Sequence, residues 1–272
     1  MNNQLGKTKL FCIIGNPVEH SLSPVMHNAG FASKKISAFY LRVPVKDLNK
    51  DVLLLRETGF SGFNITMPYK EKILDYADSL SPEVKKIGAA NTAVISKGKI
   101  KLYNTDYLAA IKLISLKTNA KKKKALVIGS GGAAKAVSYA LRKLGAQVYV
   151  TNRTFSKAQK LAKQFKAKAV KPEKAEKMEF EILVNATPVG MGKLKGKIPC
   201  SKDLIGKAEL VYESVYNPTE TKFLKEAKKM KKKTINGLEM LLEQGYASFE
   251  LFAGKKAPKK IMRHAISKEL EI

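Results

Sequence analysis

The chain has 272 residues, of which 44% are hydrophobic and 27% are charged, and this composition excludes a chain that is disordered throughout. The formal net charge of +28 comes from lysines scattered over nearly every segment, which favours exposed helix positions over a specific nucleic-acid partner. Two distant cysteines, an apolar start too short for a secretory signal, and no run of membrane-spanning length predict a soluble, cytoplasmic protein.

In the first part of the chain, short apolar runs alternate with helical patterns, which predicts a parallel α/β architecture. Ser23 followed by Pro24 has the pattern of a helix N-cap and a first helical position. Lys97-Gly98 separates two apolar segments and predicts a hairpin between them. The expected strands are residues 10–15, 38–43, 61–66, 91–96 and 99–104, and the expected helices are residues 23–33 and 47–57.

A second unit begins near Tyr107 and continues the alternation. One of its helices is expected to start at Asn217-Pro218 and to reach the Lys228 region. The other expected elements are strands at 123–129, 147–152, 180–187, 208–214 and 234–237 and helices at 131–144 and 154–164. Residues 238–272 have the pattern of two helices separated near Gly254 and Pro258, and we expect this last segment to pack back on the first unit.

The glycine-rich stretch GSGGAA follows a clear strand and opens a helix, which is where a dinucleotide's pyrophosphate binds. Gly129 allows a tight turn, Gly131 allows the backbone to approach the ligand closely, and Ala134 is small enough for helix–strand packing. Such turns often only join a strand to a helix, but the strand–helix–strand context favours cofactor binding. The expected loop contacts are Gly129, Ser130, Gly131, Gly132, Ala133 and Ala134.

About 20 residues after this loop, NAD-binding proteins place an acid that binds the ribose hydroxyls. This chain has Asn152, Arg153 and Thr154 there, with Lys157 one helical turn further on. A guanidinium suits a doubly charged phosphate, which a carboxylate would repel. The sequence therefore predicts that the ligand carries a 2′-phosphate, which makes the cofactor NADP(H).

Two polar clusters lie near predicted strand ends in the first unit. In the first, Ser21 and Ser23 are two residues apart; in an extended stretch both hydroxyls would point the same way and could hold one carboxylate. An equally good interpretation is that Ser23 only caps a helix. In the second cluster, Asn64 and Thr66 end a strand and Lys70 follows in the loop or first helical turn beyond, where a single lysine is most often a solvated surface residue.

Together these stretches resemble the shikimate dehydrogenase family, over nearly the whole chain from about Leu10. The matching blocks are HSLSPVMHN, NITMPYK, GAANTAV, NTDYLA, GSGGAAKAV, NRT, NATPVGM, VYNPTET and NGLEMLLEQ. The resemblance implies an α/β fold of two domains with a cleft between them: a substrate-binding and catalytic domain of residues 1–106 and 239–272, and a Rossmann-like, doubly wound NADP-binding domain of residues 107–238. It implies an NADP-dependent oxidoreductase that reduces 3-dehydroshikimate to shikimate in aromatic amino-acid biosynthesis.

The resemblance also implies the roles of individual residues. Lys70 and Asp106 form the catalytic pair: the ammonium stabilises the oxyanion that hydride transfer creates and supplies its proton, and the carboxylate holds the lysine. Ser21 and Ser23 hold the substrate carboxylate with Tyr216 nearby. The ring hydroxyls are bound by Asn64, Thr66, Asn91 and Gln244. The nicotinamide side is lined by Asn185, Thr187, Met191 and Gly237.

Two positions depart from the family pattern. Glu213 stands where an aspartate is expected, and Glu239 stands where a small residue is expected after Asn-Gly-Leu.

Two other interpretations of the function remain open. The first is a quinate/shikimate dehydrogenase of broader substrate or cofactor use, and the second is an NADP- or nucleic-acid-binding protein without turnover. The three histidines have no metal-binding spacing, so no metal is expected. The oligomeric state is not set by the sequence, and both a monomer and a homodimer fit it.

Overall fold

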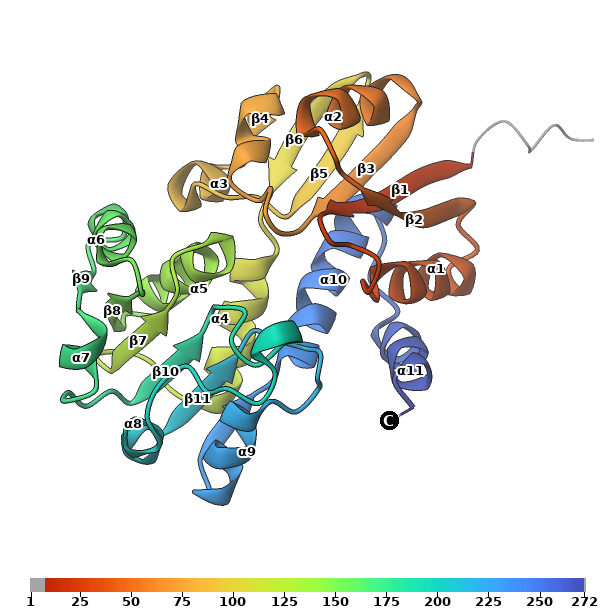
Figure 1. Ribbon diagram of the computed structural model, residues 1–272. Coiled ribbons are helices and arrows are strands. Elements are labelled where there is room, and N and C mark those ends of the chain that lie inside the picture. Colours follow the sequence, from red (N-terminus) through yellow and green to blue (C-terminus); the bar gives the residue numbers. More distant parts are fainter. Residues whose placement is uncertain (1–7, 272) are drawn as a thin grey trace, which may run out of the picture. The chain divides into compact units, whose positions relative to one another are not determined.

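The computed structural model describes residues 8–271 (Figure 1). The chain divides into two compact units, of which the first runs up to Thr105 and resumes at Leu242. The second unit is the intervening segment Asp106–Leu241. Each unit is built on its own six-stranded sheet.

The sheet of the first unit is mixed, with the strand order β2-β1-β3-β5-β6-β4. Its first three strands are parallel, whereas β5 runs antiparallel to both β3 and β6. The turn between β5 and β6 contains Lys97 and Gly98, both at positive φ, which confirms the predicted hairpin. The strands are β1 (Lys9–Gly15), β2 (Ala38–Pro44), β3 (Phe60–Ile65), β4 (Ser79–Leu80), β5 (Thr92–Ser96) and β6 (Lys99–Tyr103).

Helices cover both faces of this sheet because successive side chains of a strand point to opposite faces. Cys12 packs on one face with residues of α2, and Phe11 packs on the other with Phe31 of α1 and Phe252 of α10. Figure 1 shows α2 and α1 on opposite sides of the sheet. The helices of this unit are α1 (Ser23–Ser33), α2 (Leu48–Glu57), η2 (Lys72–Tyr76), α3 (Pro82–Ile87), α11 (Lys259–Glu269) and the later part of α10 (Gly237–Ala253).

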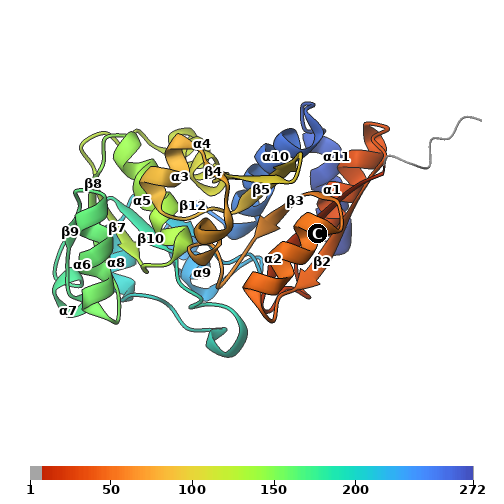
Figure 2. The same ribbon diagram turned by 90° about the horizontal axis from the view of Figure 1, so that it is seen from above.

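The C-terminal helix α11 packs against α1, and the two lie side by side in both views (Figures 1 and 2). Gly30 of α1 allows close packing on both C-terminal helices, because an added Cβ there would lie 2.7 Å from a ring carbon of Phe249 on α10 and 3.2 Å from Met262 on α11. The expectation that the last segment packs on the first unit is therefore confirmed.

The sheet of the second unit is fully parallel, with the strand order β12-β11-β10-β7-β8-β9. The order reverses between β7 and β10, so the chain winds outward in both directions from the middle, as in dinucleotide-binding folds. The strands are β7 (Lys124–Ile128), β8 (Gln147–Thr151), β9 (Lys168–Ala169), β10 (Ile182–Asn185), β11 (Leu210–Glu213) and β12 (Lys233–Ile235). The helices are α4 (Asp106–Lys117), α5 (Gly132–Lys143), α6 (Phe155–Gln164), α7 (Pro172–Ala175), η3 (Gly192–Leu194), α8 (Lys202–Lys207) and α9 (Lys222–Lys229).

One predicted N-cap and one predicted helix start were wrong. The helix expected at 23–33 is α1, but its N-cap is Leu22, which makes no side-chain cap hydrogen bond, so Ser23 is the first helical residue rather than the N-cap. The helix expected from Asn217-Pro218 is α9, which begins at Lys222. Thr221 is its N-cap and accepts a hydrogen bond from the Leu224 amide at 3.3 Å, so the signal for this helix was the threonine and not the proline.

Candidate active site

Ser21 lies in the turn before α1 and Ser23 is the first residue of that helix, so neither lies in an extended stretch, which corrects the argument from their spacing. Leu22 between them has the helical conformation (φ −86°, ψ −2°), so the two side chains are not placed by strand periodicity. Instead, the Ser21 hydroxyl oxygen accepts a hydrogen bond from the Ser23 amide at 3.3 Å. The Ser21 carbonyl accepts another from Nε of Arg42 at 2.8 Å, which ties this turn to β2. Both serines are buried.

Asn64, near the end of β3, is held by three hydrogen bonds. Its side-chain amide donates to the Asn91 carbonyl and to the Thr92 hydroxyl, both at 3.0 Å. Its oxygen accepts from the Tyr40 hydroxyl at 2.7 Å. An asparagine has two N–H donors and two acceptor positions, so both donors are used and one acceptor position is left. Asn64 can therefore accept a hydrogen bond from a ligand hydroxyl but has no N–H left to donate.

Tyr40 is a residue of this network that the sequence did not reveal. It lies on β2, is 1% exposed, and its ring stacks on that of His27 with the centroids 4.5 Å apart. Burial raises the pKa of the Tyr40 phenol well above its usual value, so this group stays a neutral donor toward Asn64. An aromatic residue in an apolar strand pattern is normally interpreted as core, which is why the pattern gave no signal.

The side chain of Asn91, just before β5, makes four hydrogen bonds to residues of the first unit. Its amide donates to the Thr105 hydroxyl at 2.8 Å and to Oε1 of Gln244 at 3.2 Å. Its oxygen accepts from the Thr105 amide at 2.7 Å and from the Thr92 hydroxyl at 3.2 Å. Asn91 therefore orients the side chain of Gln244. These two predicted site residues are 153 positions apart in the sequence.

Lys70 and Thr66 lie on the loop that follows β3. The Thr66 amide donates to the Ile14 carbonyl at 2.9 Å, which holds the start of this loop beside the end of β1. The Lys70 carbonyl accepts from the Ala90 amide at 2.8 Å, so the backbone of Lys70 is fixed next to the segment that carries Asn91. The Lys70 side chain is half-buried rather than fully solvated. The first unit thus brings Lys70 and the predicted binding residues Thr66 and Asn91 to one edge of its sheet.

Asp106 is the first residue of α4 and belongs to the second unit. Its side chain is only 4% exposed. Burial and, next, the charge of Asp106 raise the pKa of Tyr212 on β11, which places the carboxylate near this edge of the second sheet. The pairing of Asp106 with Lys70 remains a prediction.

In the glycine loop after β7, the backbone conformation and packing require glycine at position 129 but not at position 131. Gly129 has φ +123°, and a Cβ there would lie 2.7 Å from the Ala186 carbonyl oxygen, so the fold itself requires glycine. Gly131 has φ −83°, and a Cβ there would meet no protein atom within 4 Å. Gly131 is also the N-cap of α5, which has no side-chain cap. The loop therefore leaves open space at a helix N-terminus, where an anion binds well.

Arg153 lies at the same edge as the glycine loop, because β8 pairs with β7 and Thr151 is in register with Ile128. Arg153, Thr154 and Lys157 are exposed at the start of α6, which also lacks a side-chain cap. The Asn152 side chain shapes this turn by donating to the Thr154 carbonyl at 3.1 Å. The predicted 2′-phosphate site is thus an accessible cluster of one guanidinium, one ammonium and a helix start.

The loop after β10 is shaped from within by Asn185, which is fully buried. Its amide donates to the Val189 carbonyl and to Oε1 of Glu213, both at 2.9 Å. Its oxygen accepts from the Thr187 amide at 3.1 Å and from the Thr187 hydroxyl at 2.7 Å. The Thr187 hydroxyl also accepts from the Val189 amide at 3.2 Å. Asn185 and Thr187 therefore fix the path of the chain toward Met191.

The packing of the protein's own backbone requires glycine at position 237. A Cβ there would lie 2.2 Å from the Val215 carbonyl oxygen and 2.6 Å from the Tyr216 amide nitrogen. The start of α10 and the segment that carries Tyr216 therefore touch backbone to backbone, and no larger residue fits between them.

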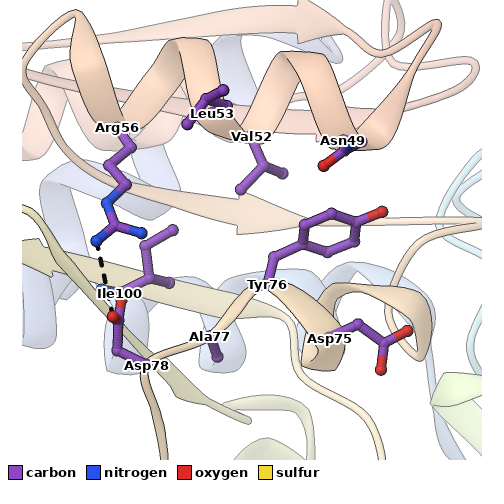
Figure 3. Close-up of a pocket in the computed structure, with 9 residues that line it drawn as sticks. All are labelled: Asn49, Val52, Leu53, Arg56, Asp75, Tyr76, Ala77, Asp78 and Ile100. Atoms are coloured by element: carbon purple, nitrogen blue, oxygen red, sulfur yellow. Dashed lines mark hydrogen bonds and ion pairs between the residues drawn. The ribbon is translucent and has the colours of Figure 1, made fainter.

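A separate pocket of about 300 Å³ lies between α2, η2 and β6 of the first unit (Figure 3). Arg56 and Asp78 form an ion pair at one end, with 3.7 Å between guanidinium nitrogen and carboxylate oxygen. None of the predicted site residues lines it.

Within residues 8–271, no group of three or more His, Cys, Asp or Glu side chains could hold a metal ion. In the same range, no helix is long and apolar enough to cross a membrane.

Three family models match consecutive parts of the chain. The shikimate dehydrogenase substrate binding domain matches residues 13–93, the shikimate/quinate 5-dehydrogenase model residues 110–190, and the shikimate 5'-dehydrogenase C-terminal domain residues 237–266. A curated relative, the shikimate dehydrogenase (NADP(+)) of Carboxydothermus hydrogenoformans, is 41% identical over 96% of this chain and 97% of its own. The family that the sequence blocks indicated is thereby confirmed.

Solved structures share the fold over nearly the full length. The shikimate 5-dehydrogenase of Thermus thermophilus, in complex with NADP(H) and shikimate, is 36% identical and matches with a TM-score of 0.87 over 96% of this chain and 99% of its own. The quinate dehydrogenase of Corynebacterium glutamicum, in complex with NAD, is 29% identical and matches with a TM-score of 0.88 over 96% and 99%. The predicted two-domain α/β fold with a Rossmann-like unit is confirmed. The same fold occurs in a shikimate dehydrogenase that binds NADP(H) and in a quinate dehydrogenase that binds NAD.

Proposed function

This chain belongs to the shikimate dehydrogenase family, and from that premise we propose that it catalyses the NADPH-dependent reduction of 3-dehydroshikimate to shikimate. The observation that carries the proposal is the 41% identity, over almost the whole of both chains, with an NADP-dependent shikimate dehydrogenase. The reaction belongs to the synthesis of aromatic amino acids. Its reactants are small and soluble, which fits an enzyme of the cytoplasm that needs no metal and no nucleic-acid partner.

The cofactor-binding domain, proposed as residues 107–238, lies within the second unit. Backbone amides around Gly131 and the N-terminus of α5 hold the pyrophosphate in the open space beside the loop. Arg153, with Lys157, holds the 2′-phosphate, and this charge pairing selects NADP over NAD. The loop of Thr187 and Met191 lines the nicotinamide, which supplies the hydride when the cofactor is bound. The fit supports NADP as the cofactor that the relatives' names give.

The substrate-binding domain, proposed as residues 1–106 and 239–272, contains the first unit and binds the substrate. Its polar groups differ in what they can do: Asn64 can only accept a further hydrogen bond, so it suits a substrate hydroxyl that donates. Gln244, oriented by Asn91, contacts another ring hydroxyl. Ser21 and Ser23 bind the carboxylate from their turn at the start of α1.

Lys70 supplies the proton that the reduced carbonyl oxygen takes up. Hydride addition leaves negative charge on that oxygen, and an ammonium held close to it both stabilises the charge and donates a proton. The Ala90 amide fixes the Lys70 backbone, so the side chain extends from a defined position. Asp106 is its proposed partner in orienting the ammonium.

The proposal is tested by following the loss of NADPH absorbance when purified protein is mixed with 3-dehydroshikimate. We expect turnover that requires the ketone and that is far slower with NADH. The reverse reaction is measured with shikimate and with quinate, because a comparable kcat/KM for quinate, or for NAD, would replace the proposal by the broader quinate/shikimate activity. Absence of turnover with every pair would contradict both.

A further inference from the structure

Glu213, at the carboxyl end of β11, is a fully buried carboxylate at the centre of a hydrogen-bond cluster. Its Oε1 accepts from the Asn185 side-chain amide at 2.9 Å and from the Val215 amide at 3.0 Å. Its Oε2 accepts from the Thr221 hydroxyl at 2.9 Å. Burying a carboxylate is costly unless donors satisfy it, so a side chain with this many donors in so little space indicates a specific role.

The three donors belong to three segments that meet around the predicted nicotinamide side. Asn185 starts the loop toward Met191. Val215 carries the carbonyl oxygen against which Gly237 packs. Thr221 caps α9 and packs against Gly190 of the same loop, where an added Cβ would lie 3.2 Å from the threonine methyl carbon. Glu213 thus joins all three segments.

We propose that Glu213 is a positioning residue for the nicotinamide half of the cofactor, and that it acts in its ionised form. The inference rests on the proposed function and names a determinant of that same site. A carboxylate accepts hydrogen bonds about twice as strong as those of a neutral oxygen, so the ionised side chain holds the Asn185 loop and the Val215 segment more tightly than the protonated one. The adenosine half of the cofactor, bound beyond β7 and β8, does not depend on it.

The surroundings of Glu213 make its proton state sensitive to pH near neutrality. Burial raises the pKa of this carboxyl to about 7, against the hydrogen bonds from Val215, Asn185 and Thr221, which lower it. Tyr212 beside it on β11 is neutral, since burial and the charges of Asp106 and Glu213 raise its pKa. The nearby acids of the α9 region are engaged elsewhere: Glu220 pairs with Lys228, and Glu226 pairs with Lys202 and Lys229.

Protonation would also change the contact with Thr221. The proton has room only on Oε2, because Oε1 already faces two N–H donors. It would then be donated to the Thr221 hydroxyl oxygen, which already accepts from the Leu224 amide at 3.3 Å. The threonine would have to turn its own hydrogen away, which loosens the contact between α9 and the loop.

The test compares the wild type with Glu213→Gln, which keeps an acceptor toward Asn185 and Val215 and places N–H donors toward Thr221. This variant imitates the protonated side chain without its titration. Two ligands are titrated by fluorescence or calorimetry: NADPH, and adenosine 2′,5′-bisphosphate, which carries the 2′-phosphate but no nicotinamide. Because the variant and the wild type are compared with the same ligand at the same pH, the titration of that ligand's own phosphates cancels in the ratio of the two proteins' dissociation constants.

We expect the Gln variant to bind NADPH about five- to tenfold more weakly than the wild type at about pH 8.5, where the wild-type carboxyl is ionised, and about equally at about pH 6. The bisphosphate should bind both proteins equally at either pH. Glu213→Asp, which restores the charge on a shorter side chain, should recover part of the NADPH affinity at the higher pH. A merely structural role would weaken both ligands together and would not depend on pH.

The proposal is overturned if NADPH affinity in the Gln variant equals that of the wild type at the higher pH, or if the bisphosphate weakens to the same extent. Should the Gln variant not fold, the wild type alone decides: NADPH is then compared with 2′-phospho-ADP-ribose, which has the same phosphates but no nicotinamide. The ratio of these two dissociation constants must change across neutral pH, and a constant ratio refutes the inference. A wild type that binds neither ligand contradicts instead the proposed use of NADP, so the two failures are distinguishable.

Discussion

Replacing Gly131 by alanine separates the demands of the cofactor from those of the fold. The residue has an extended backbone (φ −83°, ψ −171°) that alanine adopts freely, and its Cβ would meet no protein atom within 4 Å. Glycine at this position is therefore not needed for packing. If the pyrophosphate lies in that space, the added methyl group must displace it from the backbone amides.

The magnitudes follow from these two facts. Loss of chain entropy in the unfolded state stabilises Gly131→Ala by about 0.4–1 kcal/mol, and the poorer N-cap costs a similar amount. The melting temperature should therefore stay within about 2 °C of the wild type. Losing one hydrogen bond to a charged phosphate costs about 1.5–3 kcal/mol, so NADPH should bind about 10- to 100-fold more weakly. Thermal unfolding without ligand and NADPH fluorescence titration measure the two effects.

Gly129→Ala is the matched control two residues away. Its φ of +123° and the Ala186 carbonyl oxygen at 2.7 Å mean that alanine strains the backbone and clashes with it. We expect it to lower stability by about 1–3 kcal/mol or more. If Gly131→Ala bound NADPH as tightly as the wild type, or lost as much stability as Gly129→Ala, the pyrophosphate would not lie where the loop geometry indicates.

Three further outcomes are expected. Lys70→Ala should lower kcat about 10²- to 10⁴-fold, whereas the exposed Lys72→Ala should not; an unchanged kcat would remove Lys70 from the proton transfer. Arg153→Ala should raise KM for NADPH but not for NADH, with Lys163→Ala near the C-terminal end of α6 as the control, and equal changes for both cofactors would contradict 2′-phosphate recognition. Burial raises the folded-state pKa of Glu213 to about 7, so the unfolded chain releases this proton first as pH rises. The free energy of unfolding should therefore fall by up to about 4 kcal/mol between about pH 4.3 and pH 7 and level off above that. Urea unfolding should show a smaller fall in Glu213→Gln, and an identical fall would show that other groups cause it.

The elements that the sequence predicted well are those whose signal is local and long enough. β7 and β8 are buried apolar runs followed by glycine or polar residues, and their bounds differ from the expected ones by a residue or so. β4 has only two residues and α3 only six, so neither produces a periodic pattern. The strand expected at 180–187 is only Ile182–Asn185, because its polar end turns into the loop that Asn185 shapes.

The identities of the site residues could be predicted, but their hydrogen-bonding states could not. Motif order gave Asn64 and Asn91, yet nothing in NITMPYK or GAANTAV shows that Tyr40 and Thr105 supply the opposing groups. Those partners come from other strands and loops, and pairing between strands depends on a register that one segment does not encode. The serine pair shows the same limit: two residues of spacing suggested an extended chain, and the helical Leu22 changed the geometry.

The buried asparagines suggest how a site of this kind is kept rigid. Asn91 and Asn185 each use their amide hydrogens and their oxygen on the protein itself, one in each unit. A satisfied buried amide adds little net stability but is expensive to break, so it fixes one arrangement of the neighbouring chain. Some groups can still hydrogen-bond to a ligand, such as the second acceptor position of Asn64. These groups are held in place by side chains that do not themselves contact the ligand. On this view Asn91 and Asn185 act chiefly by orienting Gln244 and Thr187, and substituting them should alter both affinity and turnover because the neighbouring ligand-binding groups would shift.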